Sequence, residues 1–120
     1  MTDSSTEAVL FELLSLECRV YAKGTVRYYN KQGQLHRVYG PAVEYSDGYR
    51  AWCQNGLLHR VDGPAIEFAS GRREWYQNDR PHRLDGPAIE YSDGSCEWHI
   101  NGTELTKAEW QQAVASMGDV

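Results

Sequence analysis

The chain has few cysteines and no long hydrophobic run, and both features limit what kind of protein it can be. The three cysteines, Cys18, Cys53 and Cys96, are an odd set without paired spacing. Such a set suits neither a disulfide framework nor a zinc ribbon. The apolar run near the N-terminus is short and is broken by Glu12 and Glu17, so we expect no membrane span. The first residues carry acids where a secretory signal needs Lys or Arg. We therefore expect a cytoplasmic protein.

The chain also lacks a basic excess and a reactive motif. Its 12 Lys and Arg stand against 17 Asp and Glu, giving a formal net charge of −5. A general nucleic-acid binder needs a basic face, so nucleic acid is not an expected partner. No Ser, His and acid stand at a suggestive spacing, and no glycine-rich loop precedes a helix. We expect no enzyme, no cofactor, no small-molecule substrate and no membrane partner.

What the chain does contain is a repeat with a period of 23 residues. Its three copies run from His36 to Tyr45, from His59 to Phe68 and from His82 to Tyr91, and share the pattern His-Arg-x-x-Gly-Pro-Ala-x-Glu. A fixed period without insertions predicts small supersecondary units stacked on one another. Aliphatic residues are scarce, but eight Tyr, four Trp and two Phe can build a thin core.

Each unit reads as a β-hairpin. Residues 42–45 form a strand, 46–48 a turn with Gly48, and 49–54 the return strand, followed by a second turn at Asn55-Gly56. A degenerate first unit begins near Cys18. The expected fold is mainly β with α caps: an antiparallel meander of about four hairpin repeats in one domain, 1–120. Within it we expect an N-terminal helix at 5–17, hairpin repeats at 18–104 and a C-terminal helix at 106–117, opened by a capping box of Thr106 and Glu109.

The charges predict the register of the hairpins. A three-residue loop sets Glu44 opposite Arg50 and Ala42 opposite Trp52, and gives Glu67 the partner Arg73. A two-residue loop would instead set Glu67 against Glu74, which is unfavourable. We therefore expect the three-residue loop, with glycine at positive φ.

The repeated His-Arg-x-Asp-Gly-Pro block predicts architecture. Asp-Gly-Pro is a turn sequence, and Arg60 can pair with Asp62 two residues later. The alternative is a metal site formed by His36, His59 and His82. Equivalent residues in such a meander lie roughly 9–10 Å apart, which is twice the strand spacing, so the three rings cannot converge on one ion. We expect no metal.

An aromatic ladder runs through the units at Tyr29, Trp52, Trp75 and Trp98. It is interpreted either as core packing or as an exposed strip that binds a partner. Arg27, Arg50 and Arg73 precede it by two residues, on the same expected strand face, and Arg beside Trp is common at interfaces. The candidate partner-binding residues are Arg50, Trp52, Arg73, Trp75, Tyr76, Arg80 and Trp98.

Two sequence strings carry a resemblance to a known repeat. They are Trp-x-x-Asn-Gly-x-x-His-Arg-x-Asp-Gly-Pro-Ala-x-Glu-Tyr and the closing Asn101-Gly102-x-x-Leu-Thr-x-x-Glu-Trp110. Over residues 25–110 the chain resembles an uncharacterised 23-residue repeat of bacterial and viral proteins, distantly similar to the MORN repeat. The resemblance implies a curved run of β-hairpins, protein interaction and no catalytic residues. The His-Arg-x-Asp-Gly-Pro segment departs from typical MORN repeats, so lipid binding does not carry over.

These observations favour a non-enzymatic module that binds a protein partner. By analogy with small phage proteins of this kind, it would act as a stoichiometric inhibitor of a host protein. Two alternatives remain open: recognition of single-stranded nucleic acid by the Arg and Trp ladder, and a MORN-like membrane-associated scaffold.

Overall fold

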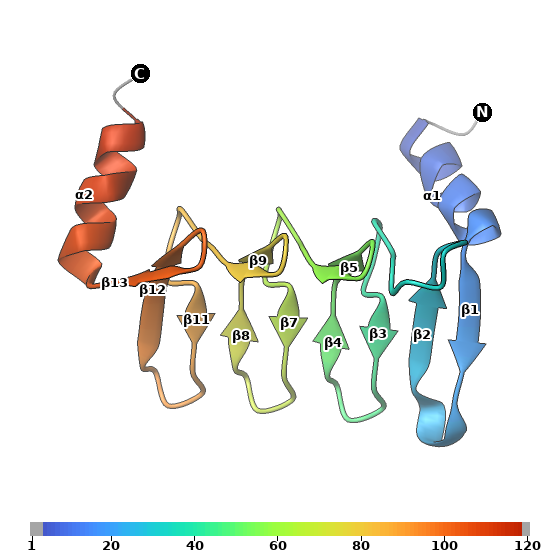
Figure 1. The fold of residues 1–120 in the computed structure, drawn as a ribbon. Coiled ribbons are helices and arrows are strands. Elements are labelled where there is room, and N and C mark those ends of the chain that lie inside the picture. Colours follow the sequence, from blue (N-terminus) through green and yellow to red (C-terminus); the bar gives the residue numbers. More distant parts are fainter. Residues whose placement is uncertain (1–3, 119–120) are drawn as a thin grey trace.

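A single large sheet runs the length of the molecule, with one helix at each end (Figure 1). The computed structural model describes residues 4–118. Within them, nine strands form the large sheet in the order β1-β2-β3-β4-β7-β8-β11-β12-β13, and every pair is antiparallel. The expected antiparallel meander is therefore confirmed.

The elements follow the chain in a regular order. They are α1 (Ser4–Ser15), β1 (Glu17–Val20), the 3-10 turn η1 (Ala22–Gly24), β2 (Val26–Tyr29), β3 (Val43–Glu44), β4 (Arg50–Ala51), β5 (Cys53–Gln54), β6 (Leu57–Leu58), β7 (Ile66–Glu67), β8 (Arg73–Glu74), β9 (Tyr76–Gln77), β10 (Arg80–Pro81), β11 (Ile89–Glu90), β12 (Cys96–Ile100), β13 (Thr103–Leu105) and α2 (Lys107–Met117). The β1–β2 hairpin stands where a degenerate first unit is expected, and the count of four repeats stays a prediction.

The predicted register is confirmed. Glu44 lies opposite Arg50, and Glu67 lies opposite Arg73. The turn glycines Gly48, Gly71 and Gly94 have φ of 104°, 97° and 91°, which a side chain would strain. The pairing continues between hairpins, because Arg50 also faces Glu67 and Arg73 also faces Glu90. One sheet face therefore carries a row of alternating charges.

The expectation of one continuous return strand from residue 49 to residue 54 is wrong. The strand breaks at Trp52, so that β4 stays in the large sheet while β5 pairs with β6 in a separate two-stranded sheet. The same break at Trp75 separates β8 from the small β9–β10 sheet. Trp52 is therefore not paired with Ala42: the Trp52 amide donates to the Ala65 carbonyl (2.7 Å), and the Ala42 amide donates to the Ala51 carbonyl.

The bend explains the small residue that follows each proline. Ala42, Ala65 and Ala88 have no exposed surface. The Ala65 and Ala88 carbonyls accept the amides of Trp52 and Trp75, so these alanines lie where the neighbouring chain leaves the sheet. Because they are fully buried there, a bulkier side chain has no room. Of the other buried hydrophobic residues, Val43, Ala51, Ile66 and Ile89 lie on one face of the large sheet, and Cys53 and Trp75 lie where the chain leaves it.

The repeated histidines connect consecutive units. The Asn55 amide donates to His36 Nδ1 (2.9 Å), the Asn78 amide to His59 Nδ1 (3.1 Å) and the Asn101 amide to His82 Nδ1 (2.9 Å). The three asparagines begin the second turn of each unit with φ near 50°. Each histidine therefore fixes the turn of the unit that follows, and only an Nδ1 without a proton can accept these hydrogen bonds.

The end helices differ slightly from the predicted ranges. α1 ends at Ser15, not at residue 17, because Glu17 begins β1 and pairs with Tyr29. α2 begins at Lys107 with Thr106 as its N-cap, and the predicted capping box is present. The Thr106 hydroxyl accepts the Glu109 amide, and Glu109 accepts the Thr106 amide. Of the helices in residues 4–118, none combines the length and the apolar character that crossing a bilayer requires.

We expect the stability of the protein to fall as the pH is lowered from 7.5 to 5.5. Burial lowers the pKa of His82 below its ordinary value of 6.5. In this range the folded chain therefore binds fewer protons at His82 than the unfolded chain, so the free energy of unfolding decreases as the pH falls through 6.5. Urea unfolding at several pH values measures the effect.

His82→Asn is the matched control. An asparagine Oδ1 can accept the Asn101 amide without titrating, so the variant should lose less stability than the wild type between pH 7.5 and 5.5. An identical pH dependence in the two proteins would contradict this role of His82.

Candidate functional site

The three copies of the His-Arg-x-x-Gly-Pro segment form corners that join neighbouring units. We call residues 36–41 corner 1, residues 59–64 corner 2 and residues 82–87 corner 3. In corner 2 the Arg60 guanidinium lies 3.9 Å from the centre of the Trp52 ring. Its Nε pairs with Asp62 (3.0 Å), and its Nη1 donates to the Pro64 carbonyl (3.0 Å). The predicted pairing of Arg60 with Asp62 is therefore confirmed.

Corner 3 repeats this geometry. The Arg83 guanidinium lies 3.8 Å from the centre of the Trp75 ring, pairs with Asp85 at 2.8 Å and donates to the Pro87 carbonyl. The motif requires glycine at this position because the arginine side chain lies against its backbone: a Cβ atom at Gly86 would lie 2.6 Å from Arg83 Cζ. Each corner arginine is thus held between an aromatic ring and a glycine.

Corner 1 differs because Tyr39 stands where the other copies have aspartate. Arg37 lies over Tyr28 (4.1 Å), and within the described chain its buried Nε has no hydrogen-bond partner. An acid from α1 occupies the corner instead. The buried Glu12 carboxylate accepts the amides of Val38 and Tyr39, the latter at 3.0 Å. α1 is therefore attached to corner 1.

Two grooves lie between consecutive corners. The central groove, about 460 Å³, lies between corners 2 and 3, and Trp75 and Gln77 contribute to its lining. The first groove, about 400 Å³, lies between corners 1 and 2 beside Trp52, and Val9 of α1 also lines it. Both grooves fall in the size range of ligand sites.

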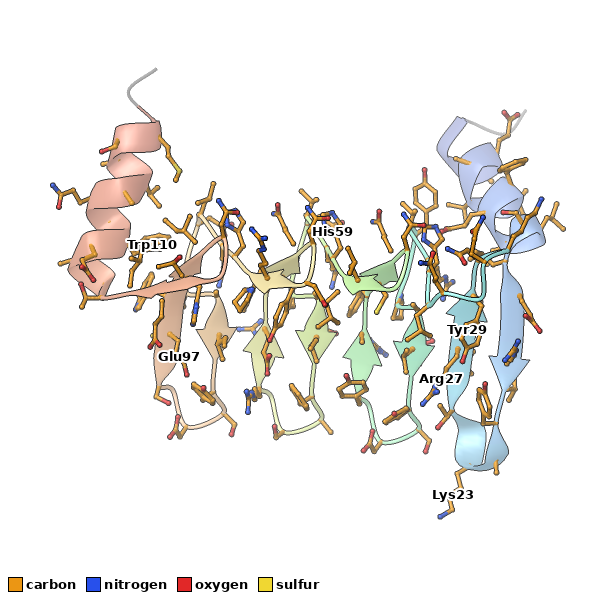
Figure 2. The ribbon with its side chains drawn as sticks, viewed as in Figure 1. Lys23, Arg27, Tyr29, His59, Glu97 and Trp110 are labelled. Atoms are coloured by element: carbon orange, nitrogen blue, oxygen red, sulfur yellow. The ribbon has the colours of Figure 1, made fainter. Side chains whose placement is uncertain are left out.

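Beyond corner 3, where a further corner arginine would cover Trp98, a side chain of α2 covers it instead. Trp110 of α2 packs against Trp98, with ring centres 4.6 Å apart, and its indole Nε1 donates to the Arg83 carbonyl at 2.9 Å. Lys107 Nζ lies 5.7 Å from the centre of the Trp98 ring, where the earlier units have a corner arginine. Figure 2 shows Trp110 at the base of α2, directed toward the repeats.

The corners also carry a row of exposed apolar side chains. The residue after each corner arginine is Val38, Val61 or Leu84, with 46%, 75% and 42% of its surface exposed. Asp62 and Asp85 follow in corners 2 and 3, with side chains 87% and 85% exposed. We call this row, together with the two grooves, the corner face. It lies between the two end helices, opposite the hairpin turns of the large sheet (Figure 1).

The structure does not bring all the predicted partner-binding residues to one face. Arg50 and Arg73 lie on the sheet face with alternating charges, paired with Glu44 (3.3 Å) and Glu90 (2.9 Å). The chain leaves the large sheet at Trp52 and Trp75, whereas Trp98 lies within the continuous strand β12. The three rings pack under Arg60, Arg83 and Trp110. The tryptophans are therefore packed rather than presented as a strip, and Trp75 is 9% exposed. The expected place of Tyr29 in this ladder is wrong, because the amide of Tyr28 donates to the Ala42 carbonyl and Arg37 covers the Tyr28 ring.

The other two candidates lie on the small β9–β10 sheet. Tyr76 is half-buried and donates its hydroxyl to the buried Glu74 (2.7 Å), and burial raises the pKa of this tyrosine. Arg80 is exposed in β10. Neither residue contributes to the lining of the two grooves.

One set of side chains in residues 4–118 has the composition of a metal site. Ligand atoms of Glu97, His99 and Glu104 all lie within 4.8 Å of one another. Both oxygens of Glu97 are already bonded, one to His99 Nε2 (3.1 Å) and the other to the Tyr91 hydroxyl, and these contacts lower the pKa of Glu97. The carboxylate is thus satisfied by the protein itself. His36, His59 and His82 each bind a different turn amide.

Of the residues that line the central groove, sequence reasoning named Trp75 but missed the others, above all Val61 and Leu84. A signal was present: an apolar residue sits inside a turn sequence in every copy of the repeat, where a structural turn has no need of one. The role of Trp110 had no such signal, because its contacts depend on where α2 returns to the repeats.

Comparisons with family models, with curated proteins and with solved structures found no match for this chain. The resemblance to MORN-like repeats therefore stays a prediction, and the function has to be inferred from the corner face itself.

Gly63→Ala should destabilise the protein by about 1–3 kcal/mol, because the added Cβ would lie 2.8 Å from Arg60 Cζ and push the guanidinium off its site. The cost should nearly vanish in an Arg60→Ala background. Urea unfolding of the two single variants and the double variant measures this coupling.

Gly71→Ala serves as the control. Its cost comes from a φ of 97° with nothing within 4 Å, so it should be the same with and without Arg60. Additive effects of Gly63→Ala and Arg60→Ala would show that the glycine is not there to admit the arginine.

Proposed function

We propose that this protein is a non-enzymatic interaction module that binds a protein partner through its corner face. The observation that carries the proposal is the exposed row of Val38, Val61 and Leu84. These apolar side chains stand at the same place in three turns and keep between 42% and 75% of their surface exposed. Exposed apolar patches beside grooves are typical of binding surfaces.

The way the arginines are used supports a protein partner over nucleic acid. Arg60 and Arg83 are held by Asp62 and Asp85, while Arg50 and Arg73 are paired with glutamates of the sheet. Phosphate binding needs a local excess of positive charge, whereas the corner face presents exposed carboxylates. An apolar row with an acidic rim is better suited to a protein surface that offers apolar and basic side chains.

A rigid repeat suits stoichiometric binding. The corners are fixed by stacked arginines and by hydrogen bonds to the following hairpin, such as that from the Arg60 amide to the Tyr76 carbonyl (3.1 Å). Because such a surface is already ordered, it loses little conformational entropy on binding. A low entropic cost favours the tight binding that an inhibitor of a host protein needs. We place this activity in the cytoplasm, in keeping with the free thiols of Cys18, Cys53 and Cys96.

Val61→Lys should abolish capture of the partner by tagged full-length protein in extracts of the native host. The substitution puts a charge into the apolar row, where the valine is 75% exposed, so folding should not suffer. Trp75→Ala is less suitable as a test, because Trp75 supports Arg83 within the fold.

Val20→Lys is the matched control. Val20 is 71% exposed and is the last residue of β1, the strand that leads away from α1 (Figure 1). This variant should capture the partner as the wild type does, and both variants should keep the wild-type melting temperature. Equal capture by the two variants would remove the corner face from consideration as the binding surface.

A further inference from the structure

We propose that the protein forms a symmetric dimer through the end of the large sheet at α1, with β1 of one copy paired to β1 of a second copy. The dimer uses a surface other than the corner face and does not depend on the proposed function. Three features of this end carry the proposal: a strand edge without a partner, charges on that strand that complement their own copy, and an exposed apolar helix face beside it.

The outer edge of β1 is open. β1 is the first strand of the large sheet, and among residues 4–118 only β2 pairs with it. Cys18 lies opposite Tyr28, whose amide donates to the Ala42 carbonyl on the β3 side of β2. In an antiparallel pair, residues that exchange hydrogen bonds alternate with residues that do not. The backbone groups of Cys18 are therefore directed away from β2 as well, to the open edge.

The charges of β1 fit a second copy of the same strand. In an antiparallel pair with its two-fold axis at Cys18, Glu17 of each copy lies opposite Arg19 of the other, so opposite charges meet twice. An axis at Glu17 or at Arg19 would instead place like charges opposite each other. Charges usually keep edge strands apart, but here one of each sign is present, and both side chains are about half exposed, at 56% and 49%.

α1 presents an apolar face that the rest of the protein does not cover. Leu10, Phe11 and Leu14 are 52%, 75% and 87% exposed. Leu10 and Leu14 lie on the side of the helix opposite Glu12, which is bonded to corner 1, and Phe11 lies beside them. The apolar face therefore points away from the repeats, at the end where β1 is the outermost strand (Figure 1). In α2, by contrast, Met117 is the only exposed large apolar residue.

The antiparallel arrangement gives this face a matching surface. α1 precedes β1, whereas Val20 and Tyr21 stand at the far end of the strand with 71% and 42% of their surface exposed. Pairing the start of β1 with the end of its copy brings the last turn of each α1 beside these two residues of the other chain. The exposed apolar side chains of this end thus cover one another, once on each side of the axis.

The charge of α1 favours a second copy over a membrane surface. The helix contains two glutamates, Glu7 and Glu12, and neither Lys nor Arg. Helices that lie on a membrane usually carry basic residues on their polar face, which attract anionic lipid. A second copy of the chain has no such requirement.

Cross-linking of full-length protein tests the position of the axis. A short bis-maleimide should join two chains of the Cys96→Ser variant, which retains the exposed Cys18, because the two Cys18 side chains lie opposite each other. Cys18→Ser is the matched control. It retains the exposed Cys96 in β12, toward the other end of the sheet, and should give no linked dimer. Sedimentation equilibrium of the wild type should show monomer and dimer in a concentration-dependent balance.

Charge variants test the register. Glu17→Arg and Arg19→Glu should each weaken self-association at least tenfold, because the pairs across the axis then carry like charges. Mixed in equal amounts, the two variants should associate with each other about as well as the wild type does with itself, since opposite charges again meet at both pairs. Loss of the Glu17–Arg19 pair within one chain, at 3.0 Å, would predict no such recovery. Failure of the mixed variants to associate would overturn the assigned register.

Leu14→Glu tests the helix face and should also weaken self-association at least tenfold. Val61→Lys is its control, because the corner face takes no part in the dimer, and should associate as the wild type does. Val20→Lys should weaken the dimer. Its melting temperature should nevertheless equal that of the wild type when both are measured at protein concentrations low enough for the monomer to prevail.

The outcomes separate the dimer from the proposed function. A wild type that stays monomeric at every concentration would overturn the dimer, and vesicles of anionic phospholipid that then bind wild type but not Leu14→Glu would assign the helix face to a membrane. Equal cross-linking of the two cysteine variants, or a dimer indifferent to Leu14→Glu, would place the contact elsewhere and overturn the assigned surface. Capture of a partner through Val61 would stand in each of these cases.

Discussion

The stacked arginine of each corner is the contact on which the rest of the structure depends. Arg60 covers Trp52, neutralises Asp62, donates to the Pro64 carbonyl and leaves room only for glycine at position 63. One side chain thus supplies apolar cover, charge and a hydrogen bond to a chain that is poor in aliphatic residues. It also explains why Arg-x-Asp-Gly is shared by corners 2 and 3, since a change at Arg60, Asp62 or Gly63 alters a contact of the arginine.

The same contact directs the chain into two layers. Because the tryptophan leaves the large sheet to lie under the corner arginine, the return strand breaks there and continues as a small second sheet. The histidine before the arginine then holds the asparagine turn of the following unit. Each unit is tied to the next through side chains of the motif as well as through strand pairing, which makes the row of corners a rigid and regularly spaced surface.

Both end helices are attached to the corners by specific contacts. α1 contributes a carboxylate to the amides of corner 1, and α2 contributes an indole to the carbonyl of corner 3. Tyr39 stands where corners 2 and 3 have an aspartate. This difference fits the arrangement, because an aspartate at that place would repel Glu12. The protein therefore closes both ends of its repeat with contacts drawn from its own helices, whereas the Arg60 carbonyl and the amides of Val61 and Asp62 in corner 2 have no hydrogen-bond partner among residues 4–118.

The sequence by itself determined the period, the register and the turns, because these depend on neighbouring residues: glycine at positive φ, Glu opposite Arg, and a capping box before α2. It also indicated the pairing of Arg60 with Asp62. Only the tertiary structure decided that the strands bend at Trp52 and Trp75, that the tryptophans lie under arginines, and that the corner face replaces a strand face as the candidate site. These features depend on contacts between separate units, such as that of Trp52 with Ala65. The alternation of inward and outward side chains along one strand contains no information about where that strand leaves its sheet.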